Sequence, residues 1–166
     1  MRIATFNING IRAAQRRGFE EWLRERQPDV VALQEVRAPA AAVPPGVFGK
    51  YHFSYEEGVL PGRNGVGILT MHPPAAVRTW SGRALVRAPG EDHSEPIELE
   101  RVPLARGLKE FADEGRYIEV DLADAPIAGR GELDFQPITG TQEAPVQRPS
   151  LRTAIVPKRA STSSNR

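Results

Sequence analysis

The chain of 166 residues contains no cysteine, which excludes a disulfide framework and thiolate metal sites. The chain also lacks an excess of either charge, since it has 22 basic and 21 acidic residues. The overall charge therefore gives no electrostatic case for nucleic-acid binding. No apolar run approaches the roughly 18 residues of a membrane span, and Asn7 and Asn9 interrupt the first run, unlike a signal peptide. We therefore expect a cytoplasmic, globular protein with no membrane partner.

The first 35 residues predict a strand, a helix and a second strand. Residues 3–6 form a short apolar run, and residues 15–27 carry apolar side chains on one face, as an amphipathic helix does before Pro28. Residues 29–33 form a continuous apolar run, which is typical of a strand buried on both faces. This order of elements indicates an α/β protein.

Polar side chains stand where both predicted strands end. Asn7 follows the first run, and Gln34 and Glu35 follow the second. If the strands are parallel, these ends meet at one edge of the sheet, where open α/β sheets bind ligands. Amide and carboxylate oxygens suit a hard cation such as Mg²⁺. Each residue also has a simpler interpretation: Asn7 as a strand end that turns at Gly10, and Glu35 as an exposed charge.

Further along, the pattern predicts a surface loop at residues 38–46 and an antiparallel hairpin of residues 51–55 with residues 65–70. It predicts two more strands, at residues 77–80 and 117–122. The long stretch of residues 82–114 is charged and rich in turn residues. We expect it to be an excursion from the sheet with one short helix at residues 104–111.

The last 44 residues differ in composition from the rest. From residue 123 onward there are five prolines and little periodicity, and no acidic residue follows Glu143. Residue 127 and residues 133–138 could pair briefly with a sheet. We expect one folded unit at residues 1–122, followed by an aberrant and mostly disordered tail at residues 123–166.

Four segments occur in a recognisable order: FNINGIR, PDVVALQE, GVGILT and EGRYI, at residues 6–12, 28–35, 65–70 and 114–118. In this order and at this spacing they resemble the exodeoxyribonuclease III and AP endonuclease family of the endonuclease/exonuclease/phosphatase superfamily. The first two segments together carry most of the specificity. The resemblance covers about residues 1–123.

This resemblance implies a four-layer α/β sandwich with two mixed sheets. It implies a monomeric nuclease of DNA base excision repair that hydrolyses phosphodiesters with Mg²⁺, or Mn²⁺ as an alternative, at abasic sites and 3′ ends of duplex DNA. Glu35 matches the principal metal ligand, and Asn7 matches an amide that joins the metal and the catalytic network. Arg116 falls in a Gly-Arg segment of the sheet, and we assign it no catalytic role.

The chain departs from the family pattern in its later part. It contains no Gly-Asp-x-Asn and no Ser-Asp-His, and none of His52, His72 and His93 follows a Ser-Asp pair, so we expect them to be surface or hairpin residues. The pattern also encodes only the leading strands of the first sheet and one hairpin, and no second sheet to cover their apolar face, which predicts an incomplete sandwich. We therefore expect a truncated N-terminal part that is inactive alone, with a tail from a shifted reading frame, an internal stop or a misassigned gene. The other two reading frames of the DNA would test the frameshift version.

Other interpretations stay open at this stage. The chain could be a non-catalytic fragment, or a module that binds DNA or a partner weakly through Lys158, Arg159 and Arg166 in the tail. It could also be a superfamily phosphodiesterase that acts on another phosphoester, in a phosphoinositide, a sphingolipid or RNA. The matches at residues 6–10 and 65–70 favour the DNA repair branch.

Overall fold

The structure is a computed structural model that describes residues 1–60, 62–123 and 152–154. Its helices are α1 (Ile11–Arg16), α2 (Phe19–Arg26) and the 3₁₀ helices η1 (Ala40–Ala42) and η2 (Arg106–Phe111). Its strands are β1 (Ile3–Asn7), β2 (Val30–Gln34), β3 (His52–Glu56), β4 (Val66–Thr70), β5 (Pro74–Thr79), β6 (Arg83–Arg87), β7 (Ile97–Glu98), β8 (Glu100–Arg101), β9 (Ile118–Leu122) and β10 (Arg152–Ala154).

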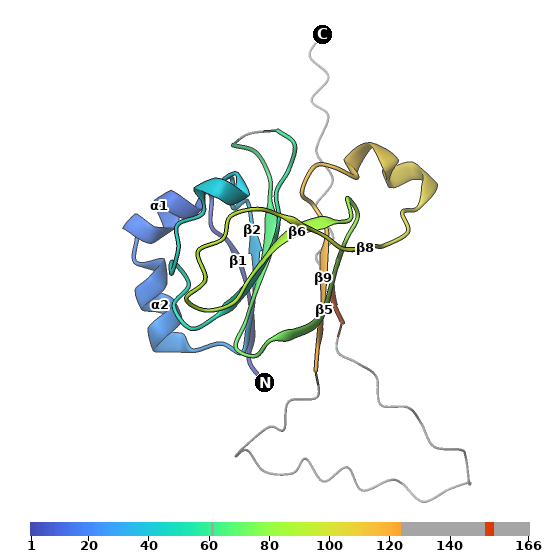
Figure 1. The fold of residues 1–166 in the computed structure, drawn as a ribbon. Coiled ribbons are helices and arrows are strands. Elements are labelled where there is room, and N and C mark those ends of the chain that lie inside the picture. The colour runs from blue at the N-terminus through green and yellow to red at the C-terminus, as the bar shows by residue number, and fades with distance from the viewer. Residues whose placement is uncertain (61, 124–151, 155–166) are drawn as a thin grey trace, which may run out of the picture.

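The first sheet has six strands in the order β1-β2-β4-β3-β6-β7. β1 and β2 are parallel, whereas β2 with β4 and β3 with β4 are antiparallel, so this mixed sheet contains the predicted hairpin. Helices α1 and α2 cover one face of the sheet (Figure 1). Val31 and Leu33 of β2 pack on the helix side and Val30 packs on the other, so β2 is buried on both faces as predicted.

The predicted helix at residues 15–27 is instead two helices. α1 begins at Ile11 and ends at Arg16, and the helix is interrupted around Gly18 before α2 begins at Phe19. Gly18 has φ +82°, a left-handed conformation that ends a helix and that glycine adopts without steric penalty. The break turns α2 so that Phe19 and Leu23 are buried against the first sheet.

A second sheet packs on the open face of the first, and the expectation that it is missing was wrong. Its strands lie in the order β10-β9-β5-β8, beside the first sheet in Figure 1. The layer between the sheets is a cluster of aliphatic side chains from both: Val30, Val66, Ile68, Val77, Ile118 and Val120. Burying each such side chain contributes about 1.5–3 kcal/mol, which makes this layer a major source of stability.

The stretch at residues 82–114 is also more ordered than predicted. β6 pairs with β3, and its Ala84 and Leu85 are buried in the first sheet. The expected short helix is present as η2. The two sheets and their helices confirm the predicted mixed α/β class.

The predicted tail lies outside the described residues, apart from Ala123 and β10, which pairs antiparallel with β9. Residue 127, residues 133–138 and the basic residues Lys158, Arg159 and Arg166 all fall outside them. Within the described ranges, no helix is long and apolar enough to cross a membrane.

Candidate functional site at the edge of the first sheet

The carboxyl ends of β1 and β2 lie side by side at one edge of the first sheet. Asn7 stands opposite Gln34 in the parallel register, and Glu35 follows directly. The chain after β1 stays beside this segment, since the Ile8 N–H donates to the Gln34 carbonyl at 3.1 Å and the Gly10 N–H to the Glu35 carbonyl at 2.8 Å. The backbone therefore brings the segments of Asn7 and Glu35 together at the edge where the sequence predicts a site.

Two further side chains connect this edge. The Asn7 Oδ1 accepts a hydrogen bond from the Asn9 N–H at 3.1 Å. Arg37 Nη2 lies 2.8 Å from Glu35 Oε2, and Arg37 Nη1 donates to Asn9 Oδ1 at 2.6 Å. The Glu35 side chain is 37% exposed, so its carboxylate is fixed by Arg37 and still open to solvent.

The backbone at this edge is strained. Asn9, Glu35, Arg37 and Asn64 have φ values of +46°, +54°, +53° and +52°, in the left-handed region. Asparagine tolerates this region, whereas glutamate and arginine rarely adopt it, so the strain lies at Glu35 and Arg37. Arg37 contacts the other three residues: its guanidinium contacts Glu35 and Asn9, and its N–H donates to the Asn64 carbonyl at 3.0 Å. Such conformations persist only where surrounding contacts enforce them, and they gather at functional sites.

A buried carboxylate joins the two sheets near the end of β3. Glu56 is 1% exposed and accepts hydrogen bonds from the Ser81 N–H at 3.1 Å and the Tyr117 N–H at 3.3 Å. Burial raises the pKa of Glu56, and these hydrogen bonds partly oppose the shift. Next to it, the Gly65 N–H donates to the Gly115 carbonyl at 3.1 Å, so both sheets support the loop that borders Glu35.

The histidines lie away from this edge. His52 pairs with Thr70, and Thr70 pairs with Val30 at the start of β2, so His52 stands at the opposite end of the sheet. His72 follows Thr70 at that end and accepts a hydrogen bond from its hydroxyl through the carbonyl oxygen. The His93 carbonyl accepts a hydrogen bond from Arg87 Nε at 3.0 Å, and Arg87 stands opposite Phe53 in the sheet.

Arg116 contacts two residues of the preceding segment, Glu114 and Phe111. Its Nε forms an ion pair with the Glu114 carboxylate, and its guanidinium carbon lies 5.5 Å from the centroid of the Phe111 ring. Arg116 lies two residues before β9 begins at Ile118, so, contrary to the prediction, it precedes the sheet and is not one of its strand residues. Among the described residues, no group of three or more histidine, aspartate or glutamate side chains could hold a metal ion.

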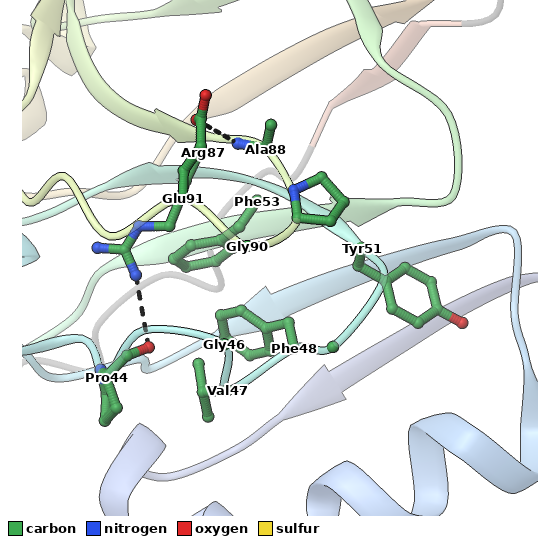
Figure 2. A pocket seen from close by; sticks show the side chains of 12 residues that line it. Pro44, Gly46, Val47, Phe48, Tyr51, Phe53, Arg87, Ala88, Gly90 and Glu91 are labelled. Atoms are coloured by element: carbon green, nitrogen blue, oxygen red, sulfur yellow. Dashed lines mark hydrogen bonds between the residues drawn. The ribbon is translucent and has the colours of Figure 1, made fainter.

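A small pocket lies far from this edge, between the loop around Phe48 and the end of β6. Figure 2 shows the Arg87 guanidinium pointing across it toward the carbonyl of Pro44. Arg87 Nη2 has no hydrogen-bond partner in the described structure, but the pocket holds only about 10 Å³. That volume is about the size of one water molecule, so the pocket is too small for a substrate.

The sequence interpretation missed the parts played by Arg37 and by the side chain of Asn9. Arg37 stands two residues after Glu35, a separation that in an extended strand places both side chains on one face. The observed contact instead depends on left-handed backbone at Glu35 and Arg37, for which neither residue type gives a signal.

Comparisons with known proteins point to one group. A model of the Endonuclease/Exonuclease/phosphatase family matches residues 4–133. DNA-(apurinic or apyrimidinic site) endonuclease of Dictyostelium discoideum is 30% identical over 85 residues, or 51% of this chain and 24% of the relative. Exodeoxyribonuclease III of Haemophilus influenzae is 32% identical over 78 residues, or 47% of this chain and 29% of the relative.

A solved structure agrees with these matches. An AP endonuclease from Archaeoglobus fulgidus matches 74% of this chain and 37% of its own, with 27% identity and a TM-score of 0.51. The matches therefore span less than a third of each of the two curated relatives and little more than a third of the solved one.

Proposed function

Because the chain belongs to the Endonuclease/Exonuclease/phosphatase family, we propose that the edge carrying Asn7 and Glu35 is one half of a phosphodiesterase site for DNA repair. The observation that carries the proposal is the convergence of an amide and a solvent-accessible carboxylate at the ends of parallel strands. The named relatives act on apurinic or apyrimidinic sites and as an exodeoxyribonuclease. The proposed substrate is therefore duplex DNA with abasic sites or 3′ ends, bound by a monomer.

The residues at this edge fit a hard divalent cation, with Mg²⁺ as the proposed ion and Mn²⁺ as a substitute. Glu35 supplies a carboxylate. The Asn7 Oδ1 accepts a hydrogen bond from the Asn9 N–H, and an amide oxygen has a second lone pair with which to bind a cation. Mg²⁺ keeps several waters and is held by one or two carboxylates together with substrate phosphates. Two oxygen donors from this chain are thus a chemically reasonable half of such a site.

When bound, the cation would neutralise a phosphate oxygen and the negative charge that develops on the leaving oxygen. The chain's own residues do the positioning. Asn9 fixes the orientation of the Asn7 amide through its N–H, and the strained backbone at Glu35 fixes the direction of the carboxylate. Such preorganisation lowers the barrier because the groups need not reorganise during the reaction.

A general base is still required to prepare the attacking water. The three histidines lie elsewhere, and the sequence contains neither Gly-Asp-x-Asn nor Ser-Asp-His. We therefore propose that this 166-residue chain binds a cation but does not cleave DNA by itself. We also propose that the nuclease-like unit ends near Leu122, the last residue of β9.

The test combines cation binding with an incision assay on a duplex that carries one abasic site, in Mg²⁺. We expect Mn²⁺ binding that Glu35→Gln abolishes and that Glu20→Gln, an exposed substitution on α2, leaves intact, without incision by any variant. Equal Mn²⁺ binding by the wild type and Glu35→Gln would contradict the site. Incision that depends on Glu35 would contradict the proposed inactivity and strengthen the site.

A further inference from the structure

The Arg37 guanidinium is held from two directions. Its Nη2 lies 2.8 Å from Glu35 Oε2, and its Nη1 donates to Asn9 Oδ1 at 2.6 Å. The backbone N–H of the same residue donates to the Asn64 carbonyl at 3.0 Å. The side chain is nevertheless 41% exposed, so the guanidinium can meet a ligand from solvent.

The surface ion pair of Arg24 with Glu21 on α2 has a different environment: its side chains are 71% and 64% exposed and it lies on a regular helix. Arg37 and its two partners, Asn9 and Glu35, all have left-handed backbone. The fold therefore holds this guanidinium beside Glu35 through a backbone conformation that Glu35 and Arg37 rarely adopt without tertiary contacts.

Arg37 and a cation compete for the same carboxylate. A divalent ion on Glu35 would stand within a few ångströms of the guanidinium, and two positive charges at that distance repel. A phosphodiester oxygen relieves this conflict, because a guanidinium binds phosphate as well as carboxylate. Asn9 can keep its hydrogen bond to Nη1 while Nη2 changes partner.

We propose that Arg37 is a DNA-binding residue with two alternative partners at Nη2: the Glu35 carboxylate in the cation-free protein, and a DNA phosphate oxygen when a cation occupies the edge. This inference rests on the proposed function of the same edge. It assigns Arg37 two opposite effects, weakening cation binding in the absence of DNA and strengthening DNA binding in the presence of a cation.

The first test measures Mn²⁺ binding to the full chain by electron paramagnetic resonance of the free ion. Arg37→Gln removes the competing charge and should lower the Kd for Mn²⁺ about three- to tenfold. Arg24→Gln is the matched control, since it also breaks an Arg–Glu pair, and should leave the Kd unchanged. Melting temperatures within a few degrees of the wild type would show that each variant is folded.

The second test measures binding of a fluorescent abasic-site duplex by anisotropy, with Ca²⁺ as the cation and a series of salt concentrations. Arg37→Gln should weaken binding and reduce the slope of log K against log salt by about 0.9, the value for one lost phosphate contact. Arg24→Gln should change neither quantity.

The outcomes separate this inference from the proposed function. If Glu35→Gln abolishes Mn²⁺ binding but Arg37→Gln changes neither the Mn²⁺ affinity nor the salt slope, Arg37 is a surface ion pair and only its role is overturned. A wild-type chain that binds Mn²⁺ and shows no salt-dependent DNA binding overturns the phosphate contact. Mn²⁺ binding that survives Glu35→Gln overturns the cation site itself, and the role of Arg37 with it.

Discussion

Replacing Glu56 by alanine should loosen the contact between the two sheets. The carboxylate of this residue accepts hydrogen bonds from the Ser81 and Tyr117 N–H groups, which belong to the turn after β5 and the segment before β9. An unsatisfied buried donor costs about 1–3 kcal/mol, so these two partly buried groups together would cost at most about 6 kcal/mol. Loss of the unfavourable burial of the carboxylate offsets part of this. We expect Glu56→Ala to lower the free energy of unfolding by about 2–4 kcal/mol, out of roughly 5–15 kcal/mol for a typical domain.

The same residue should make stability depend on pH. Burial raises the pKa of Glu56 in the folded chain above its ordinary value of 4.5. Below pH 4.5 the carboxyl is protonated in both the folded and the unfolded chain, and its contribution to stability is fully present. As the pH rises from there through the raised pKa, the unfolded chain ionises first, so that contribution is lost. Glu56→Gln cannot ionise and should lack this slope.

Urea denaturation between pH 5 and 8 would measure both effects, with the fluorescence of Trp22 and Trp80 as the signal. Glu20→Ala, an exposed change on α2, is the control and should stay within about 0.5 kcal/mol of the wild type. An unfolding free energy for Glu56→Ala within that same margin would refute the role of Glu56 between the sheets. Identical pH slopes for the wild type and Glu56→Gln would refute the raised pKa.

Two further substitutions test the packing that supports the edge. Gly115 has φ +63°, and a Cβ atom there would lie 2.5 Å from the backbone nitrogen of Gly58, so Gly115→Ala should destabilise the fold by at least about 2 kcal/mol in urea denaturation. Gly90→Ala, with φ +82° in open space, should cost only about 1–2 kcal/mol, and equal costs would contradict the clash. Leu85 of β6 is 0% exposed, and Leu85→Ala should cost about 2–5 kcal/mol, while Val59→Ala, at a residue 68% exposed, should stay within about 0.5 kcal/mol. A Leu85→Ala variant as stable as Val59→Ala would show that β6 does not belong to the core.

The elements that were predictable have a local signature. β2 is a run of apolar residues, and β3 and β4 flank a loop rich in glycine, so both follow from periodicity and turn chemistry. β6 was missed because its apolar residues lie between Arg83 and Arg87, and charged residues usually indicate a segment exposed to solvent. Arg87 is nevertheless only 5% exposed, with its guanidinium bonded to backbone carbonyls.

The second sheet was missed for a different reason. β5 and β9 are recognisable as strands with one apolar face, but the sequence does not say which layer that face covers. Their other side carries Arg78, which forms ion pairs with Glu119 at 3.2 Å and with Asp121 at 2.8 Å. In the sequence, these charged residues suggest exposed strands and give no sign that the opposite face belongs to the core. Strand partners far apart in sequence are set by packing between layers, which periodicity does not encode.

For the site, strand ends were enough to place Asn7 and Glu35 near each other. The parallel register of β1 and β2 follows from the strand–helix–strand order, and the carboxyl ends then meet at one edge. The contact of Arg37 with Glu35 was not predictable, because it arises from left-handed backbone that only tertiary contacts impose.

A cation site at this edge is tested most directly by a titration of the ¹⁵N-labelled chain with Mn²⁺, followed by paramagnetic broadening of its NMR signals. We expect the signals of Asn7, Ile8 and Glu35 to broaden first and that of His52, at the opposite end of the sheet, to broaden last, and we expect Glu35→Gln to remove this order. Broadening that begins at His52, or that is unchanged in Glu35→Gln, would contradict the site.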